Sequence, residues 1–90
     1  MMYYVYVLES LKDNHFYIGC TNNIKNRLQL HNLGKVYSTK LRRPFKIIYC
    51  EIYPNKGDAF TREKFLKTGW GRNYLKRVLE NYFEAKKLGR

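Results

Sequence analysis

The segment that organises this chain reads Tyr17-Ile18-Gly19-Cys20-Thr21-Asn22-Asn23-Ile24-Lys25-Asn26-Arg27-Leu28-Gln29-Leu30-His31. Its start belongs to a short apolar strand, residues 16–19, and the polar residues that follow lead into a helical pattern. Thr21 or Asn22 is suited to cap the N-terminus of that helix, and Gly34 is suited to end it. The segment therefore predicts a strand, a turn and a helix in succession.

Two polar side chains interrupt the apolar face of this predicted helix. At about 100° per residue, one continuous arc holds Leu30, Arg27, His31, Ile24 and Leu28. Burying an unpaired guanidinium is costly, so Arg27 needs an anion or a route to solvent. Two interpretations stay open: a structural arginine, ion-paired or extended along the helix edge, and a cleft where Arg27 and His31 meet a phosphate.

The composition is strongly basic. Lys and Arg number 18 against 7 Asp and Glu, giving a formal net charge of +11. Such an excess favours a polyanionic partner, most simply nucleic acid, although the chain could also be a protein that happens to be basic. A content of 44% hydrophobic and 17% aromatic residues argues against disorder, and ninety residues suffice for one domain with a single core.

The cysteines and the apolar segments of the sequence indicate the cellular compartment of the protein. Cys20 and Cys50 are the only cysteines, and no second Cys/His cluster accompanies them, so a structural zinc site is not expected. Neither a signal peptide nor an apolar run of membrane-spanning length is present. These features predict a cytoplasmic protein with two reduced thiols and no membrane partner.

Three strands are predicted. Residues 3–8 form an apolar and aromatic strand covered on both faces, and turn residues at 12–14 return the chain as the strand 16–19. Any register that pairs Tyr6 with position 17 or 19 puts Tyr6 and Tyr17 on one face, where Gly19 leaves room beside them. The segment Phe45–Tyr53, bracketed by Pro44 and Pro54, is apolar on both faces and is predicted to be the central strand or close to it.

A basic loop precedes this third strand. Residues 35–44 combine positive charge with hydroxyl groups, a mixture that suits contact with a phosphate backbone, although a solvated basic loop is equally consistent with it. The candidate nucleic-acid-binding residues are Lys35, Thr39, Lys40, Arg42 and Arg43, with Arg72 from the last helix.

The next helix follows the turn at 55–58, with Asp58 as its expected cap. Along one arc it places Leu66, Ala59, Glu63 and Phe60, so Glu63 lies on the apolar side, as Arg27 does on the first helix. The two charges could pair with each other. They could also flank a substrate phosphate with Glu63 holding a divalent cation, because one carboxylate suffices for a Mg²⁺ ion that keeps most of its waters.

The C-terminal third is predicted to be helical. Gly69-Trp70-Gly71 is expected to break the preceding helix, and a last helix then packs on the sheet through Tyr74, Leu75, Val78, Leu79, Tyr82 and Phe83. We expect one domain over residues 1–84 and a basic tail over 85–90 that frays.

With these residues in place, the sequence resembles the GIY-YIG endonuclease superfamily, most closely its small single-domain bacterial members. Tyr17-Ile18-Gly19 matches the second signature element, and Tyr4-Val5-Tyr6 stands at the first in degenerate form. Arg27, His31 and Glu63 follow at the spacing of the family's arginine, histidine and metal-binding glutamate. The resemblance extends from Tyr3 to about Leu79. In one departure, Leu75 stands near the place where many members carry asparagine, with Asn73 an approximate substitute.

The resemblance implies an α+β fold, a three-stranded antiparallel sheet flanked by helices. It also implies a metal-dependent endonuclease that hydrolyses phosphodiester bonds with Mg²⁺ or Mn²⁺. DNA is the expected substrate ahead of RNA, which stays open, and the expected role is in repair or recombination. Tyr6 or Tyr17, assisted by His31, would deprotonate or orient the attacking water. Arg27 would stabilise charge on the phosphate and Glu63 would hold the metal. The alternative is a non-catalytic nucleic-acid-binding module with this fold, and in either case a protein partner could supply specificity.

Overall fold

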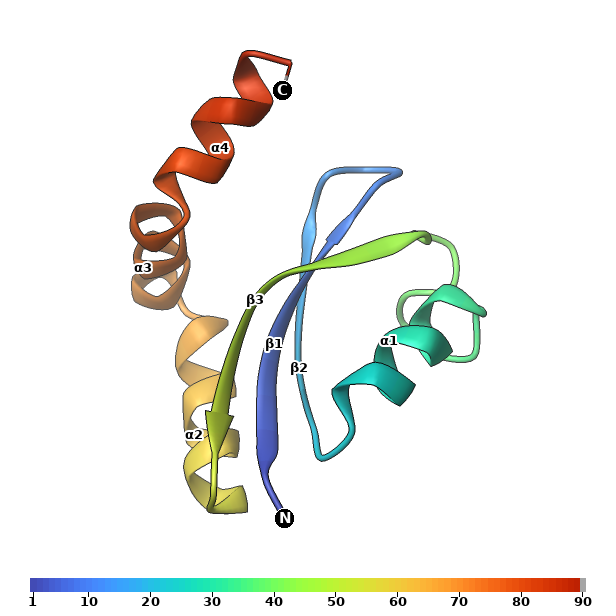
Figure 1. Cartoon of the computed structure of the whole chain (residues 1–90), viewed down its shortest axis with the longest axis vertical. Coiled ribbons are helices and arrows are strands. Elements are labelled where there is room, and N and C mark those ends of the chain that lie inside the picture. Colours follow the sequence, from blue (N-terminus) through green and yellow to red (C-terminus); the bar gives the residue numbers. More distant parts are fainter. Residues whose placement is uncertain (90) are drawn as a thin grey trace.

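Apolar strands and short capped helices build one sheet with helices on both faces (Figure 1). The computed structural model describes residues 1–89. The strands are β1 (Tyr3–Ser10), β2 (Phe16–Thr21) and β3 (Phe45–Tyr53). The helices are α1 (Ile24–Asn32), α2 (Lys56–Leu66), α3 (Gly69–Val78) and α4 (Glu80–Lys87). The predicted α+β class, with a three-stranded antiparallel sheet flanked by helices, is confirmed.

The strand order is β2-β1-β3, so the first strand of the chain is central. Residues 45–53 were predicted to be the central strand or close to it; β3 lies beside the central strand, at an edge of the sheet. The expectation that both of its faces are covered is wrong. The coverage of β3 is one-sided: Ile47 and Cys50 are exposed, and Ile52 keeps 56% of its surface. The pairing of β1 with β3 shifts by one residue between Val7 and Leu8, opposite Ile48. The shift brings Ile47 to the same face as Cys50 and Ile52.

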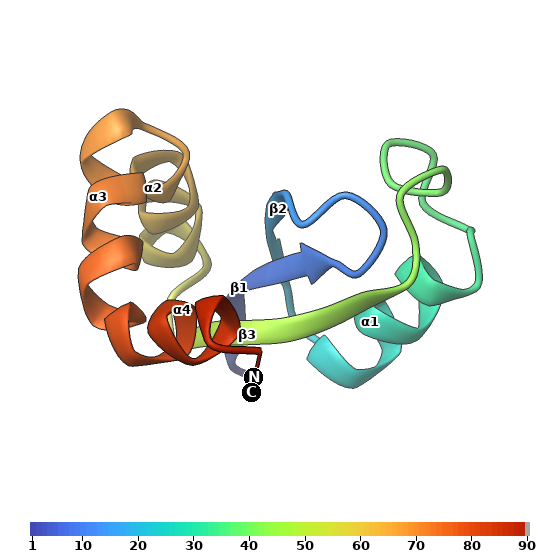
Figure 2. The same cartoon turned by 90° about the horizontal axis from the view of Figure 1, so that it is seen from above.

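The alternation of side chains along β1 creates two cores, one on each face of the sheet (Figure 2). One face is covered by α2, α3 and α4, and its core contains Val5, Val7, Ile18, Ala59, Leu66 and Leu75. The other face is covered by α1, and its core contains Tyr6, Leu8 and Phe45, with Tyr17, Ile24 and Leu28 packed against them. The tyrosines of the candidate site thus belong to the α1 side.

Asparagines cap the first two helices. Asn23 accepts a hydrogen bond from the Asn26 amide at the start of α1, one residue after the expected cap, and Gly34 follows the helix with a φ of +75°. Asn55 caps α2 by accepting from the amides of residues 57 and 58. Asp58, the predicted cap, lies inside the first turn of α2, where its negative charge suits the helix dipole.

The break after α2 differs from the prediction. It falls at Lys67 and Thr68, and the Thr68 hydroxyl caps α3 by accepting from the Gly71 amide. Gly69 and Gly71 therefore begin α3 instead of breaking a helix. Gly71 has a packing role, because a Cβ added there would lie 2.8 Å from the carbonyl carbon of Leu66 on α2. The expected single last helix is divided at Leu79 into α3 and α4.

Helix α4 is held against the sheet by a buried carboxylate. Glu9 of β1 accepts hydrogen bonds from Tyr82 and Lys86, and Phe83 stacks on Phe16 with ring centroids 5.7 Å apart. Residues 85–87 accordingly belong to α4, three residues beyond the expected boundary at 84; Arg90, the end of the predicted tail, lies outside the described residues. Across residues 1–89, none of the helices has the length and apolar character needed to cross a bilayer.

Candidate active site

Tyr6, Tyr17 and His31 meet on the α1 side of the sheet. Tyr6 pairs with Gly19 and Leu8 pairs with Tyr17, so the two tyrosines share a face as the sequence predicts. Helix α1 packs on that face and brings His31 against both rings. The ring centroid of His31 lies 4.9 Å from that of Tyr17 and 5.9 Å from that of Tyr6.

Gly19 is the position that admits the Tyr6 ring. A Cβ added to Gly19 would lie 2.5 Å from Cζ of Tyr6 and 3.1 Å from its Cε1. Ordinary contacts of a Cβ are 3.4–4 Å. The phenol thus lies directly across the glycine, and any side chain there would displace it.

A directional chain of hydrogen bonds runs from Tyr6 into the loop after α1. The Tyr6 hydroxyl lies 3.0 Å from Nε2 of His31, and Nδ1 of His31 lies 2.8 Å from Oγ1 of Thr39. Oγ1 of Thr39 donates its proton to the carbonyl oxygen of Val36, at 3.4 Å. A hydroxyl has one proton, so Thr39 accepts from Nδ1–H. Nε2 is then unprotonated and accepts from the Tyr6 hydroxyl.

Burial fixes the charge states of this pair. It raises the pKa of Tyr6 to about 12, against the opposing effect of the Arg27 guanidinium. It lowers the pKa of His31 to about 4, and the positive charge of Arg27 contributes to the same shift. His31 is 0% exposed. At neutral pH the phenol therefore keeps its proton and the imidazole is neutral, as the hydrogen-bond directions require.

Arg27 and Glu63 act on Tyr6 from two helices without neutralising each other. The charge of Arg27 lowers the pKa of Tyr6 and that of Glu63 raises it, so both groups lie near the phenol. Within residues 1–89, Arg27 forms no ion pair, and Glu63 pairs only with Lys67, at 3.1 Å. The interpretation in which Arg27 and Glu63 form an internal ion pair is therefore wrong.

Glu63 is the residue able to hold a metal ion. Its side chain is 20% exposed, and the ammonium of Lys67 beside it shows that a cation can reach the carboxylate. No group of three or more His, Cys, Asp or Glu side chains within residues 1–89 could hold a metal between them. A single carboxylate fits a hydrated Mg²⁺ or Mn²⁺ ion that takes its other ligands from water and substrate phosphate.

The basic loop only partly presents the surface that the sequence predicts. Thr39 is fully buried against His31, and Arg42 pairs with Asp13 at 2.8 Å while donating to the Phe16 carbonyl. Both hold the loop in place, and their binding of nucleic acid stays a prediction. The exposed candidates of the loop are Lys35, Lys40 and Arg43.

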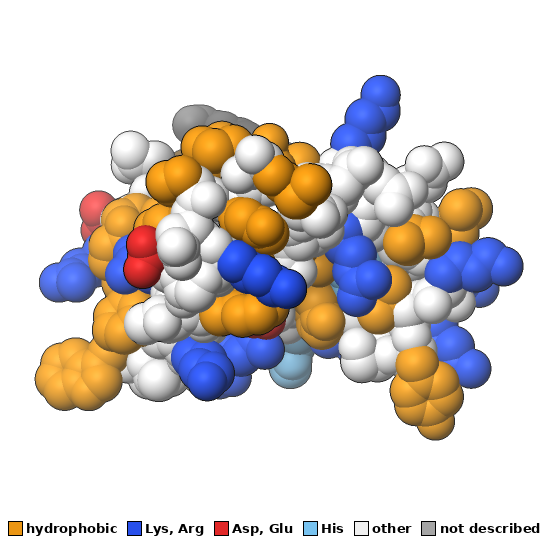
Figure 3. Space-filling view, turned by 90° about the horizontal axis from the view of Figure 1, so that it is seen from below, with side chains coloured by type: hydrophobic (Ala, Val, Ile, Leu, Met, Phe, Trp, Pro, Cys, Tyr) orange, Lys and Arg blue, Asp and Glu red, His pale blue; other side chains and the backbone are white. Residues whose placement is uncertain are grey.

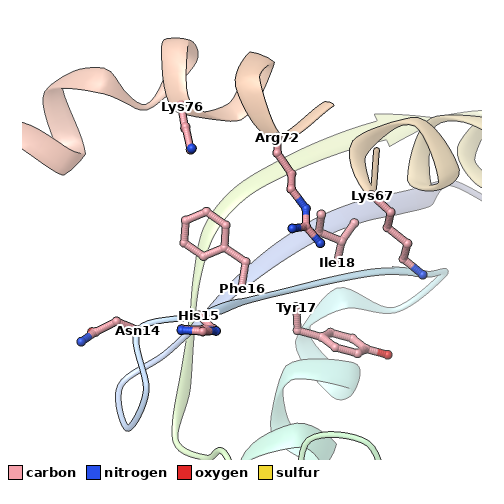
Figure 4. A pocket seen from close by; sticks show the side chains of 8 residues that line it. All are labelled: Asn14, His15, Phe16, Tyr17, Ile18, Lys67, Arg72 and Lys76. Carbon is pink, nitrogen blue, oxygen red and sulfur yellow. The ribbon is translucent and has the colours of Figure 1, made fainter. Parts of the chain in front are cut away.

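A second basic surface follows the outer edge of β2. A groove of about 680 Å³ is lined by Asn14, His15, Phe16, Tyr17, Ile18, Lys67, Arg72 and Lys76 (Figure 4). Arg72 was predicted to bind nucleic acid, whereas Lys67, Lys76 and His15 were missed. Arg72 and Lys76 are four residues apart, which places them on one face of a helix. This spacing is the signal in the sequence from which the basic side of the groove could have been predicted. Basic side chains also outnumber acidic ones on the face shown in Figure 3.

The position related to the family's asparagine contributes no polar group here. Leu75 is fully buried in the core beneath α3, and Asn73 is exposed on the same helix.

Comparisons with known proteins agree with this geometry. Residues 2–78 match the model of the GIY-YIG catalytic domain. The chain is 39% identical to UPF0213 protein SH2523 of Staphylococcus haemolyticus, over 87% of this chain and 95% of that protein. It is 38% identical to a UPF0213 protein of Limosilactobacillus reuteri, over 98% and 94% of the two chains. The solution structure of UPF0213 protein BH0048 from Bacillus halodurans is similar, with a TM-score of 0.55 and 31% identity over 87% of this chain and 85% of that one.

Proposed function

This chain belongs to the GIY-YIG catalytic domain family, a nuclease superfamily, and we propose that it is a metal-dependent endonuclease that hydrolyses phosphodiester bonds in DNA. One observation carries the proposal. Arg27, which forms no ion pair within residues 1–89, and the partly exposed Glu63 both lie near a Tyr6 hydroxyl that is hydrogen-bonded to a neutral, buried His31. A structural arginine and glutamate would be expected to pair.

In this mechanism Tyr6 and His31 move the proton of the attacking water. As water attacks phosphorus, its proton passes to the Tyr6 oxygen while the Tyr6 proton passes to Nε2 of His31. The Nδ1–H bond to Thr39 keeps the imidazole oriented to receive it. Tyr17, whose ring contacts His31, would orient the water instead of deprotonating it.

The two charged side chains have separate roles. Arg27 would stabilise the negative charge that develops on the phosphate oxygens, since its guanidinium has no competing anion within residues 1–89. Glu63 would hold Mg²⁺ or Mn²⁺, whose chemistry when bound is to polarise the phosphate and stabilise the leaving oxygen.

DNA is the preferred substrate class in this proposal, with RNA as the competing one. A net charge of +11 supports a polyanionic substrate of either kind. We place the activity in DNA repair or recombination in the cytoplasm, with a protein partner contributing specificity; the two free thiols, Cys20 and Cys50, suit a reducing compartment.

A second candidate function is a non-catalytic nucleic-acid-binding module. The observation that favours it is the Lys67–Glu63 pair, in which an ammonium already occupies the neighbourhood of the expected metal ligand. Binding through the basic surface would then persist without turnover.

A cleavage assay separates the two candidates. Supercoiled, linear, single-stranded and branched DNA would be incubated with Mg²⁺, Mn²⁺ or EDTA. Glu63→Gln would be compared with Glu84→Gln, a matched change at an exposed glutamate of α4 that pairs with Lys87. We expect metal-dependent cleavage by the unmodified chain and by Glu84→Gln, and none by Glu63→Gln. Cleavage by all three would indicate a contaminating nuclease, and salt-sensitive binding without cleavage would establish the binding module.

A further inference from the structure

The groove along β2 has two chemically different walls. One wall consists of Lys67 at the end of α2 with Arg72 and Lys76 on α3. The other belongs to the β1–β2 hairpin and β2, and includes the ring side chains His15 and Phe16. Tyr17 also lines the groove, but its ring lies on the opposite face of β2, against His31. Figure 4 shows the basic side chains of the helices reaching toward this strand. A wall of cations facing a wall of rings is the arrangement that holds a nucleic-acid strand with exposed bases.

The groove is continuous with the candidate active site. Lys67 lines the groove and pairs with Glu63 at 3.1 Å, and Tyr17 lines it while its ring contacts His31. A strand that lies in the groove therefore passes the groups assigned to metal binding and water activation.

The basic wall is available to a ligand. Arg72 and Lys76 are exposed, and neither forms an ion pair within residues 1–89. Among the described residues Lys67 pairs only with Glu63, and its own side chain is 54% exposed. Arg42 of the basic loop is by contrast tied to Asp13. Arg72 and Lys76 can therefore reach a phosphate backbone without first breaking a salt bridge within residues 1–89.

The ring wall favours unpaired bases. In a duplex the base faces are stacked on one another, whereas in a single strand they are free to lie on an aromatic side chain. His15 is exposed at the hairpin, and Phe16 is fixed by stacking on Phe83 with ring planes inclined at 20°. Such rings add nothing to duplex binding but contribute to the binding of each base of a single strand.

We propose that the β2 groove binds a single-stranded segment of nucleic acid adjoining the bond to be cleaved, with phosphates on Lys67, Arg72 and Lys76 and bases on His15 and Phe16. The position of the cleaved bond rests on the proposed nuclease function. The binding itself does not, and is measured without turnover.

The test measures equilibrium binding in EDTA. The readout is the fluorescence anisotropy of labelled oligothymidine and of a labelled blunt duplex of equal length. Arg72→Gln/Lys76→Gln would be compared with Lys64→Gln/Arg77→Gln, which removes the same charge from exposed positions of α2 and α3 that do not line the groove. We expect tighter binding of the single strand by the unmodified chain. The groove variant should bind it about tenfold more weakly, with a salt slope lower by about 1.4, or about 0.7 for each lost phosphate contact. The control should change neither quantity.

A further variant tests the ring wall. His15→Ala, at an exposed site, should weaken single-strand binding by about fivefold and leave duplex binding unchanged, because base stacking is lost. Equal affinity for duplex and single strand, or an equal loss in the groove and control variants, would overturn the proposal. These binding outcomes do not test the proposed nuclease activity, and a failure to cleave DNA would not change the binding result. Each of the two proposals can therefore be refuted without the other.

Discussion

Replacing Gly19 by alanine tests the geometry on which the candidate site depends. The added methyl would lie 2.5 Å from Cζ of Tyr6, where a normal contact needs at least 3.4 Å, so the ring has to move by about 1 Å. Tyr6 is 1% exposed and has little free space. The movement should break the 3.0 Å hydrogen bond to Nε2 of His31.

The cost follows from these two effects. Overpacking a filled core costs about 1–3 kcal/mol, and losing a buried hydrogen bond adds about 1 kcal/mol. We therefore expect Gly19→Ala to lower the free energy of unfolding by about 2–4 kcal/mol. If the nuclease proposal holds, cleavage should fall by about 100-fold, because a misplacement of about 1 Å at a reacting group has an effect of that order.

Two other glycines supply matched controls. A Cβ at Gly69, in the first turn of α3, meets no atom of residues 1–89 within 4 Å, so Gly69→Ala should stabilise the protein by up to about 1 kcal/mol. A Cβ at Gly71 meets the backbone of Leu66, which cannot rotate away as a side chain can. Gly71→Ala should therefore cost at least as much stability as Gly19→Ala, about 3 kcal/mol or more, while leaving the His31 hydrogen bond in place in the folded protein.

Urea denaturation followed by circular dichroism would give the three free energies. The ¹⁵N chemical shifts of the His31 ring would report the bond to Tyr6. The reasoning fails if the free energy of unfolding of Gly19→Ala lies within about 0.5 kcal/mol of that of the unmodified chain and the His31 shifts are unchanged. The Tyr6 ring would then not lie across Gly19.

Three more outcomes are expected. The pKa of His31 is about 4 in the folded chain against 6.5 in the unfolded one, so the unfolded chain binds more protons below pH 6.5. Stability should be retained above that pH and fall by about 3 kcal/mol as pH drops to 4, and urea denaturation of His31→Gln should lack this slope. Thr39→Val removes the acceptor of Nδ1–H and should mix the His31 tautomers in the ¹⁵N spectrum, lowering kcat about tenfold with KM unchanged; a single unchanged tautomer would contradict the hydrogen-bond chain through Tyr6. Lys67→Gln frees Glu63 from an exposed ion pair and should tighten Mn²⁺ binding about twofold by relaxation titration, whereas weaker binding would argue against Glu63 as the ligand.

The sequence predicted the elements whose signals are local. The bounds of β3 follow from apolar residues between Pro44 and Pro54, and the structure has the same bounds, Phe45–Tyr53. Arg27 and Glu63 could be singled out because a charge on an apolar helix face is unusual wherever the helix lies. Neither inference needed knowledge of what surrounds the segment.

The errors concern contacts between segments far apart in the sequence. Two apolar faces on residues 45–53 predicted a strand covered on both sides, central or close to it, yet β3 is an edge strand with one exposed face. The central strand is β1, since all of its residues from Val5 to Ser10 are buried and both other strands pair with it. Thr39 looked like one more hydroxyl in a basic loop, and only the folded loop brings it 2.8 Å from His31. Burial and pairing of this kind depend on competition among segments, which composition and periodicity do not resolve.

The strand order that the sequence missed is also the one that the candidate site requires. Helices on opposite faces of a sheet are separated by its thickness, about 10 Å on each side, so their side chains approach one another only around a free edge. Strand β2 is such an edge, with α1 on one face and α2 on the other, and Gly19 in it leaves the space that the Tyr6 ring occupies. If β3 were the central strand instead, β1 and β2 would not be neighbours. Tyr6 could then not pair with Gly19, and its hydroxyl would lie one strand further from the β2 edge. A central β1 therefore explains how a single phenol comes under the influence of both Arg27 and Glu63.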